Sequence, residues 1–177
     1  MLEIRRLCRS MSDHVLFLVV EDNEDHVLLI ERAFAKCKVL NPIQVVRSGQ
    51  EAVDYLSGKG RYTNREEFPL PGLLLLDLKM PGMDGFDVLR WIRQQPGLRA
   101  LRVVVLTSSN EIRDVNLAYQ LGANSFLVKP ADFDDFVRVT QALQGYWLWT
   151  DKEPQAFRPP RRGEPRNGGM SGKSGSK

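Results

Sequence analysis

Five short apolar runs, separated by segments of helical periodicity, constrain the fold of this chain more than any other feature. Uninterrupted apolar strands of this kind are typical of parallel sheets, in which helices cover both faces. Alternation of such strands with helical patterns indicates an α/β domain. The runs occupy residues 15–20, 43–46, 73–76, 103–106 and 125–128. The sequence therefore predicts five βα units built on one parallel sheet.

The segments between the runs carry signals for the starts and ends of helices. Asn23 and Ser48 are suitable N-cap residues, because their side chains can accept hydrogen bonds from free N–H groups of a first turn. Gly58 is placed to end the second helix. We expect Ser109 or Asn110 to cap the fourth helix. A helix is thus expected after each strand.

Composition and charge bound the organisation of the chain. The 177 residues are 42% hydrophobic, which predicts one globular domain of usual size. The formal charge of +3 belongs to the two ends, because residues 12–150 sum to −3. We expect a flexible extension over residues 1–12, a domain over 13–150 and a disordered basic tail over 151–177. A mildly acidic domain disfavours nucleic-acid binding.

The sequence also disfavours a membrane-spanning protein, a disulfide-rich protein and a protein with its own DNA-binding module. No apolar run approaches the roughly 20 residues that cross a bilayer. Cys8 and Cys37 are too few and too far apart for a disulfide framework or a zinc site. The residues after Trp149 are too few and too polar for a DNA-binding module. We therefore expect a cytoplasmic protein with no membrane or DNA partner.

Charged and hydroxyl side chains follow four of the five apolar runs. Glu21 and Asp22 follow the first, Asp77 the third, Thr107 the fourth and Lys129 the fifth. Parallel strands end at one edge of a sheet, so these side chains are expected to meet there. Clustered carboxylates repel one another, and a bound cation would neutralise this repulsion. Mg²⁺ is the expected cation because it prefers oxygen ligands. Such a site suits attack by a carboxylate on a phosphoryl group.

This set of residues resembles the receiver domain of two-component response regulators. The resemblance runs from about residue 15 to residue 149 and is carried by Glu21-Asp22, by Asp77 with Met80-Pro81 and Asp84-Gly85, by Thr107, and by Lys129-Pro130. It implies a flavodoxin-like, doubly wound (βα)5 fold with strand order 2-1-3-4-5. It also implies a single-domain phosphoacceptor that catalyses its own phosphotransfer and dephosphorylation, rather than an enzyme with a separate substrate.

The resemblance assigns a role to each acid. It implies that Asp77 accepts the phosphoryl group from a sensor histidine kinase. Asp22, Asp77 and the backbone carbonyl of Lys79 would bind Mg²⁺ directly, and Glu21 would act through water. We further hypothesise that the side chains of Lys79 and Ser109 tune how long the phosphoryl group lasts.

The remaining residues of the set are implied to respond to phosphorylation. Thr107 resembles the switch hydroxyl and Phe126 the switch aromatic, although a strand aromatic is also commonly just a packing residue. Lys129 resembles the lysine that pairs with the phosphoryl group. The resemblance also implies a cis peptide bond between Lys129 and Pro130.

Two further features resemble the single-domain regulators that partner bacterial phytochrome kinases. They are the long polar loop at residues 59–71 and the aromatic ending at residues 144–149. The resemblance implies a homodimer through the face made by the fourth helix, the fifth strand and the fifth helix. A bacterial phytochrome is accordingly the candidate kinase.

Two other functions remain open at this point. Aspartyl-nucleophile phosphatases also use Mg²⁺ and a strand-end Asp, with a second Asp two residues later as acid and base. In this chain that position is Lys79. A docking module that keeps the fold without being phosphorylated is the other alternative, and the intact acid set with Thr107 and Lys129 argues against it.

Overall fold

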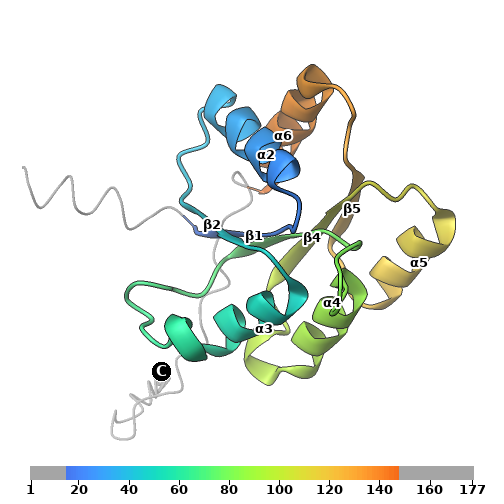
Figure 1. The fold of residues 1–177 in the computed structure, drawn as a ribbon. Helices are drawn as coiled ribbons and strands as arrows, with labels where there is room; N and C mark the ends of the chain where they lie inside the picture. The colour runs from blue at the N-terminus through green and yellow to red at the C-terminus, as the bar shows by residue number, and fades with distance from the viewer. Residues whose placement is uncertain (1–14, 148–177) are drawn as a thin grey trace, which may run out of the picture.

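The computed structural model describes residues 15–147, and side chains as far as residue 143. Five strands alternate with five α-helices in this part of the chain (Figure 1). The strands are β1 (Phe17–Val20), β2 (Ile43–Val46), β3 (Leu73–Leu76), β4 (Arg102–Thr107) and β5 (Ser125–Val128). The helices are α2 (Glu24–Lys36), α3 (Gly49–Ser57), α4 (Gly85–Gln94), α5 (Ile112–Gln120) and α6 (Phe133–Trp147), with 3₁₀ turns η1 (Gly60–Tyr62) and η2 (Pro96–Leu98).

The strands form one parallel sheet in the order β2-β1-β3-β4-β5, which confirms the predicted order 2-1-3-4-5. The central pairing sets Val20 of β1 beside Leu76 of β3, and Leu76 beside Val105 of β4. Because the strands run in register, their carboxyl ends lie along one edge of the sheet. The residues that follow each strand are therefore brought together at that edge.

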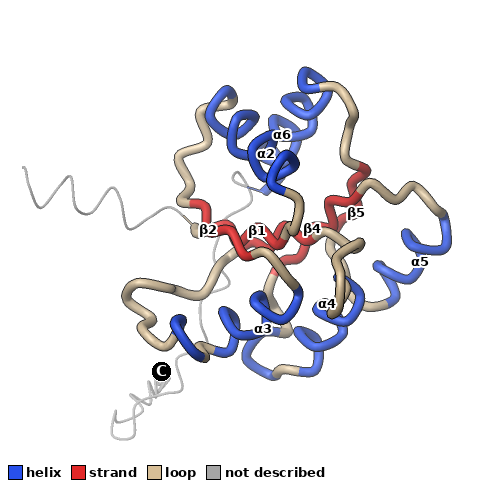
Figure 2. The backbone as a smooth tube through the Cα atoms, viewed as in Figure 1, coloured by secondary structure: helices blue, strands red, loops and turns tan. Residues whose placement is uncertain are grey.

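Both faces of the sheet are covered, as Figure 2 shows. Helices α2 and α6 contact each other on one face, and α3, α4 and α5 lie on the other (Figure 1). Side chains of a strand alternate between faces. Leu74 and Leu76 thus belong to the core beneath α3 to α5, whereas Leu73 and Leu75 belong to the core beneath α2 and α6. A strand buried on both sides explains the uninterrupted leucine run.

Three predicted helix signals are confirmed and one is wrong. Asn23 Oδ1 accepts from two N–H groups of the first turn of α2, and Ser48 Oγ accepts from one in α3. Gly58 ends α3 with a left-handed φ of 67°. Helix α5 instead begins after Glu111, whose side chain makes no capping hydrogen bond. Ser109 does not cap it because its hydroxyl donates to Asp114 inside the helix.

The long connection between α3 and β3 is fastened to the domain. The Tyr55 hydroxyl donates to the carbonyl of Pro69 at 2.9 Å, and Tyr55 is fully buried. The Arg65 guanidinium donates to the carbonyls of Tyr55 and Leu56, two acceptors at the end of α3. This polar loop is therefore held against the domain by hydrogen bonds to α3.

Several predictions concern parts of the chain outside the described residues. They are the extension at 1–12, the tail at 151–177 and the outer limits of the predicted domain. The side chains of the aromatic ending at 144–149 are not described either. No helix within residues 15–147 has the length and apolar character needed to cross a membrane.

Candidate functional site

Backbone hydrogen bonds fix the two acids that follow the central strands. The Glu21 N–H donates to the carbonyl of Val46 at 3.1 Å, which extends the β1–β2 ladder by one residue. The Asp77 N–H donates to the carbonyl of Val20 at 3.0 Å, which extends the ladder between β3 and β1. Both acids therefore start from positions held by the sheet itself.

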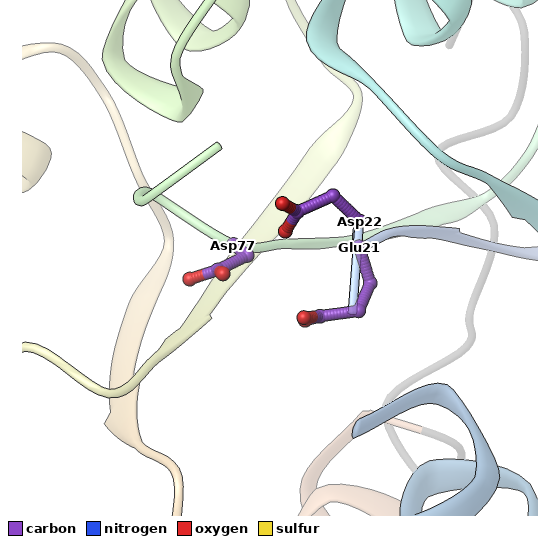
Figure 3. Close-up of side chains that lie close together, drawn as sticks. All are labelled: Glu21, Asp22 and Asp77. Atoms are coloured by element: carbon purple, nitrogen blue, oxygen red, sulfur yellow. The ribbon is translucent and has the colours of Figure 1, made fainter. Parts of the chain in front are cut away.

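Glu21, Asp22 and Asp77 form an acidic cluster at the carboxyl edge of the sheet. Each contributes a carboxylate oxygen, and these oxygens lie within 4.8 Å of one another. The carboxylates of Asp22 and Asp77 approach each other, and that of Glu21 lies below them (Figure 3). Glu21 and Asp77 are buried, whereas Asp22 is exposed. The cluster is thus open to solvent on the side of Asp22.

Lys129 offsets part of this negative charge. Its Nζ lies 2.6 Å from Glu21 Oε2 and 3.1 Å from Asp77 Oδ2, and its side chain is 6% exposed. Its backbone N–H donates to the carbonyl of Thr107 at 2.8 Å. Three carboxylates and one ammonium leave a net charge of −2 at the cluster. That charge and the all-oxygen donor set fit a hard divalent cation such as Mg²⁺.

The two expected switch residues lie on β4 and β5. Thr107 is fully buried at the end of β4. Phe126, on β5, is partly buried and packs against the core beneath α3 to α5. This position suits the simple packing interpretation as well as a switch, so both switch roles stay predictions.

The turn after Asp77 is closely packed against the acid. The Gly85 N–H donates to the carbonyl of Leu78 at 3.1 Å. A Cβ at Gly85 would lie 2.2 Å from the carbonyl oxygen of Asp77. Gly82 in the same turn has a positive φ of 75°. The glycines of this motif therefore allow the turn to fold back onto the strand end.

One expectation about the site is wrong and another has no direct support. No peptide bond within residues 15–147 is cis, so the bond between Lys129 and Pro130 is trans. The trans form is favoured even before proline, and Lys129 reaches both acids with it. The carbonyl of Lys79 stays a predicted ligand. The Lys79 side chain is half exposed, and its Nζ lies 3.0 Å from Asp114 Oδ2.

Sequence reasoning missed two residues around the cluster. His26 Nδ1 lies 2.8 Å from Glu21 Oε1 and 3.1 Å from Lys129 Nζ. Asp114 accepts from the Ser109 hydroxyl at 2.6 Å in addition to the Lys79 ammonium. His26 is detectable only from its place in the first turn after the acid pair. Asp114 has no local signal, because its partners come from two other loops.

Family comparison agrees with this geometry. The family model described as the response regulator receiver domain matches residues 17–141, which contain the whole sheet and the acidic cluster. The chain belongs to the response regulator receiver family. Membership identifies the domain as a phosphoacceptor module and makes a histidine kinase its class of partner.

Relatives of this receiver domain include three with clear similarity. The probable methanogenesis regulatory protein FilR2 of Methanothrix harundinacea is 40% identical over 81% of this chain and 90% of its own length. Response regulator Rcp1 of Synechocystis is 34% identical over 80% of this chain and 94% of its own length. A crystal structure of the Mn²⁺-bound form of Rcp1 has a TM-score of 0.69, covering 77% of this chain and 96% of that one. The phosphorylated cyanobacterial phytochrome response regulator RcpA has a TM-score of 0.71 at 35% identity, covering 76% and 94%.

Proposed function

We propose that Asp77 accepts a phosphoryl group from a phosphohistidine of a sensor histidine kinase in a Mg²⁺-dependent reaction. In this transfer the bond between the histidine nitrogen and phosphorus breaks, and a bond between phosphorus and an Asp77 carboxylate oxygen forms. The observation that carries the proposal is the convergence of Glu21, Asp22 and Lys129 on Asp77 at the end of β3. The proposal is also supported by the similarity of this chain to RcpA, which has been crystallised in its phosphorylated form.

The residues divide the chemistry between them. Asp22, Asp77 and the carbonyl of Lys79 would hold the cation, with Glu21 acting through water. Mg²⁺, when bound, supplies charge neutralisation at the phosphoryl oxygens. The Leu78 N–H donates to Asp77 Oδ1 at 2.7 Å and fixes the orientation of the carboxylate. Lys129, already 3.1 Å from Asp77 Oδ2, is placed to pair with the transferred group. The domain thereby catalyses its own phosphotransfer and dephosphorylation.

The proposed output is a change in protein contacts. Thr107 and Phe126 would move toward the phosphoryl group and shift the packing near α5. Helix α5 and strand β5 expose Ile112, Tyr119 and Val128 on this side of the molecule. Together with α6 they form the face predicted for a homodimer, because exposed apolar groups of this kind favour a partner surface. The similarity to RcpA supports a bacterial phytochrome as the kinase.

The phosphatase alternative has less support than phosphoacceptance. A phosphatase of that class needs a carboxyl group two residues after its nucleophile. Here the residue is Lys79, whose ammonium forms an ion pair with Asp114 and has no proton-accepting capacity while charged.

Mass measurement after incubation with acetyl phosphate and Mg²⁺ tests the proposal. We expect a gain of one phosphoryl group that is lost in Asp77→Asn and on removal of Mg²⁺ with a chelator. Asp87→Asn is the matched control, because Asp87 is an exposed helix residue paired with Arg90, and it should label normally. Absence of labelling in the parent protein would refute the proposal. Repeated turnover of a small phosphate ester would favour the phosphatase instead.

A further inference from the structure

Asp114 joins two loops that border the candidate site. Its Oδ2 accepts from the Ser109 hydroxyl at 2.6 Å and lies 3.0 Å from Lys79 Nζ. Lys79 belongs to the loop that follows Asp77, and Ser109 to the loop that follows Thr107. The Ser109 N–H also approaches Thr107 Oγ1 at 3.4 Å. Asp114 itself lies in the first turn of α5. One carboxylate thus ties both site loops to that helix.

The two ends of the ion pair differ in their freedom. The side chain of Asp114 is 9% exposed, whereas that of Lys79 is 52% exposed. The Asp114 carboxylate is fixed in place, because the Ser109 hydroxyl and the Lys79 ammonium both contact its Oδ2 atom. The ammonium is held at the end of a flexible stem, so it is the partner that can move.

We propose that Asp114 is a positioning residue that competes with a phosphoryl group on Asp77 for the Lys79 ammonium. The inference rests on the function proposed above. The phosphoryl oxygens carry roughly −1.5 to −2 charges in place of the −1 of the free Asp77 carboxylate, and this exceeds the single charge of Asp114. Lys79 lies only two residues after Asp77 and is exposed enough to turn toward it. Phosphorylation then weakens the tie between the β3–α4 loop and α5.

This competition couples the site to the surface of α5. Coupling between two sites is reciprocal. If a phosphoryl group on Asp77 loosens the first turn of α5, then a change that loosens this turn beforehand makes Asp77 bind such a group more tightly. The same helix exposes Ile112 at its start and Tyr119 near its end. Release of Lys79 therefore acts on the helix that carries the apolar residues of the proposed dimer face.

Beryllofluoride with Mg²⁺ is the probe, because it is a stable tetrahedral mimic of the phosphoryl group. Its affinity is measured by calorimetry for the parent, Asp114→Asn, Lys79→Met and the double variant. Asparagine keeps the oxygen that accepts from Ser109 but removes the charge that holds Lys79. We expect Asp114→Asn to bind about threefold more tightly than the parent, as suits the loss of a partly exposed ion pair. In the Lys79→Met background the same change should have no effect.

Hydrogen–deuterium exchange provides the second readout. Beryllofluoride is expected to raise exchange in the first turn of α5 in the parent. In Asp114→Asn that exchange should be raised already and change little further. Asp134→Asn is the matched control, because it removes the Lys36–Asp134 ion pair between α2 and α6 on the other face of the sheet. It should alter neither the affinity nor the exchange of α5.

The results separate the competition from the function on which it rests. Failure of the parent protein to bind beryllofluoride and to gain a phosphoryl group refutes both. Normal labelling of the parent, with equal affinities for the parent and Asp114→Asn, refutes the competition alone. The competition is also refuted if Asp114→Asn tightens binding equally in the presence and absence of Lys79.

Discussion

Replacing Gly85 with alanine is expected to destabilise the domain and to disturb Asp77 together. Gly85 is the first residue of α4, and its backbone lies directly against the end of β3. A methyl group there would lie 2.2 Å from the carbonyl oxygen of Asp77 and 2.8 Å from the Cα of Leu78. Both obstacles are backbone atoms, which cannot turn aside as a flexible side chain can. Relief therefore requires the turn or the strand end to move.

The size of the effect follows from two opposed contributions. Forcing extra volume into a well-packed region costs about 1–3 kcal/mol. Alanine is favoured over glycine inside a helix by up to about 1 kcal/mol, and by less at its first residue. The expected net loss is about 1–2 kcal/mol in the free energy of unfolding. For a domain of this size that is roughly 3–6 °C in melting temperature.

Chemical denaturation and acetyl phosphate labelling check this expectation together. Gly97→Ala is the control, because a Cβ at Gly97 meets no atom within 4 Å. We expect that control to stay within about 0.5 kcal/mol of the parent. Labelling of Gly85→Ala at Asp77 should be slowed about tenfold or more, since small displacements of reacting groups have large effects on rate. Equal stability of the two variants, with normal labelling, would refute the reasoning.

Two further predictions concern single side chains. Lys129→Met leaves Glu21 and Asp77 without their shared ammonium, so we expect the free energy of unfolding to fall by about 3 kcal/mol and Mg²⁺ to restore part of it. Thermal denaturation with and without the cation measures both effects. Lys36→Met is the control, because the ion pair of Lys36 is exposed and its loss should matter far less; equal losses in the two variants would contradict the prediction. Burial raises the pKa of the Cys37 thiol because it disfavours the thiolate. Alkylation of Cys37 by iodoacetamide, followed by peptide mass mapping, should therefore be slower than alkylation of free cysteine at pH 8. The pH at which its rate is half-maximal should be higher than for free cysteine. A lower pH of half-maximal rate would contradict the raised pKa.

Local signals in the sequence were sufficient for the frame of the fold. The run at Leu73–Leu76 coincides with β3, because a strand buried on both faces has no polar positions to obscure its limits. Asn23 and Ser48 cap their helices as predicted, since capping depends on residues only two or three positions apart. The strand order came from the resemblance, and the structure confirms it. The acids and Lys129 meet as expected because parallel strands share an edge.

Side-chain contacts between the loops and helix starts at the site were beyond local reasoning. Ser109 does not cap α5 as the sequence predicts, because its hydroxyl donates to Asp114 five residues later. His26 lies beside Glu21 only because α2 begins where β1 ends. Asp114 and Lys79 are 35 positions apart, and nothing near either residue indicates the ion pair. The ion pair between Lys79 and Asp114 depends on how loops from separate βα units approach one another. The other two contacts depend on how a strand end meets the helix that follows it, and periodicity describes neither.

The strand order gives the two halves of the site different mechanical surroundings. The acids that would hold the cation follow β1 and β3, each flanked by strands on both sides, whereas Phe126 and Lys129 belong to β5 and its end, at the margin of the sheet. Marginal segments open locally at lower free energy than central ones. In the function proposed above, the residues that would hold the cation follow central strands, whereas the proposed switch aromatic Phe126 lies on a marginal strand that can shift at lower cost.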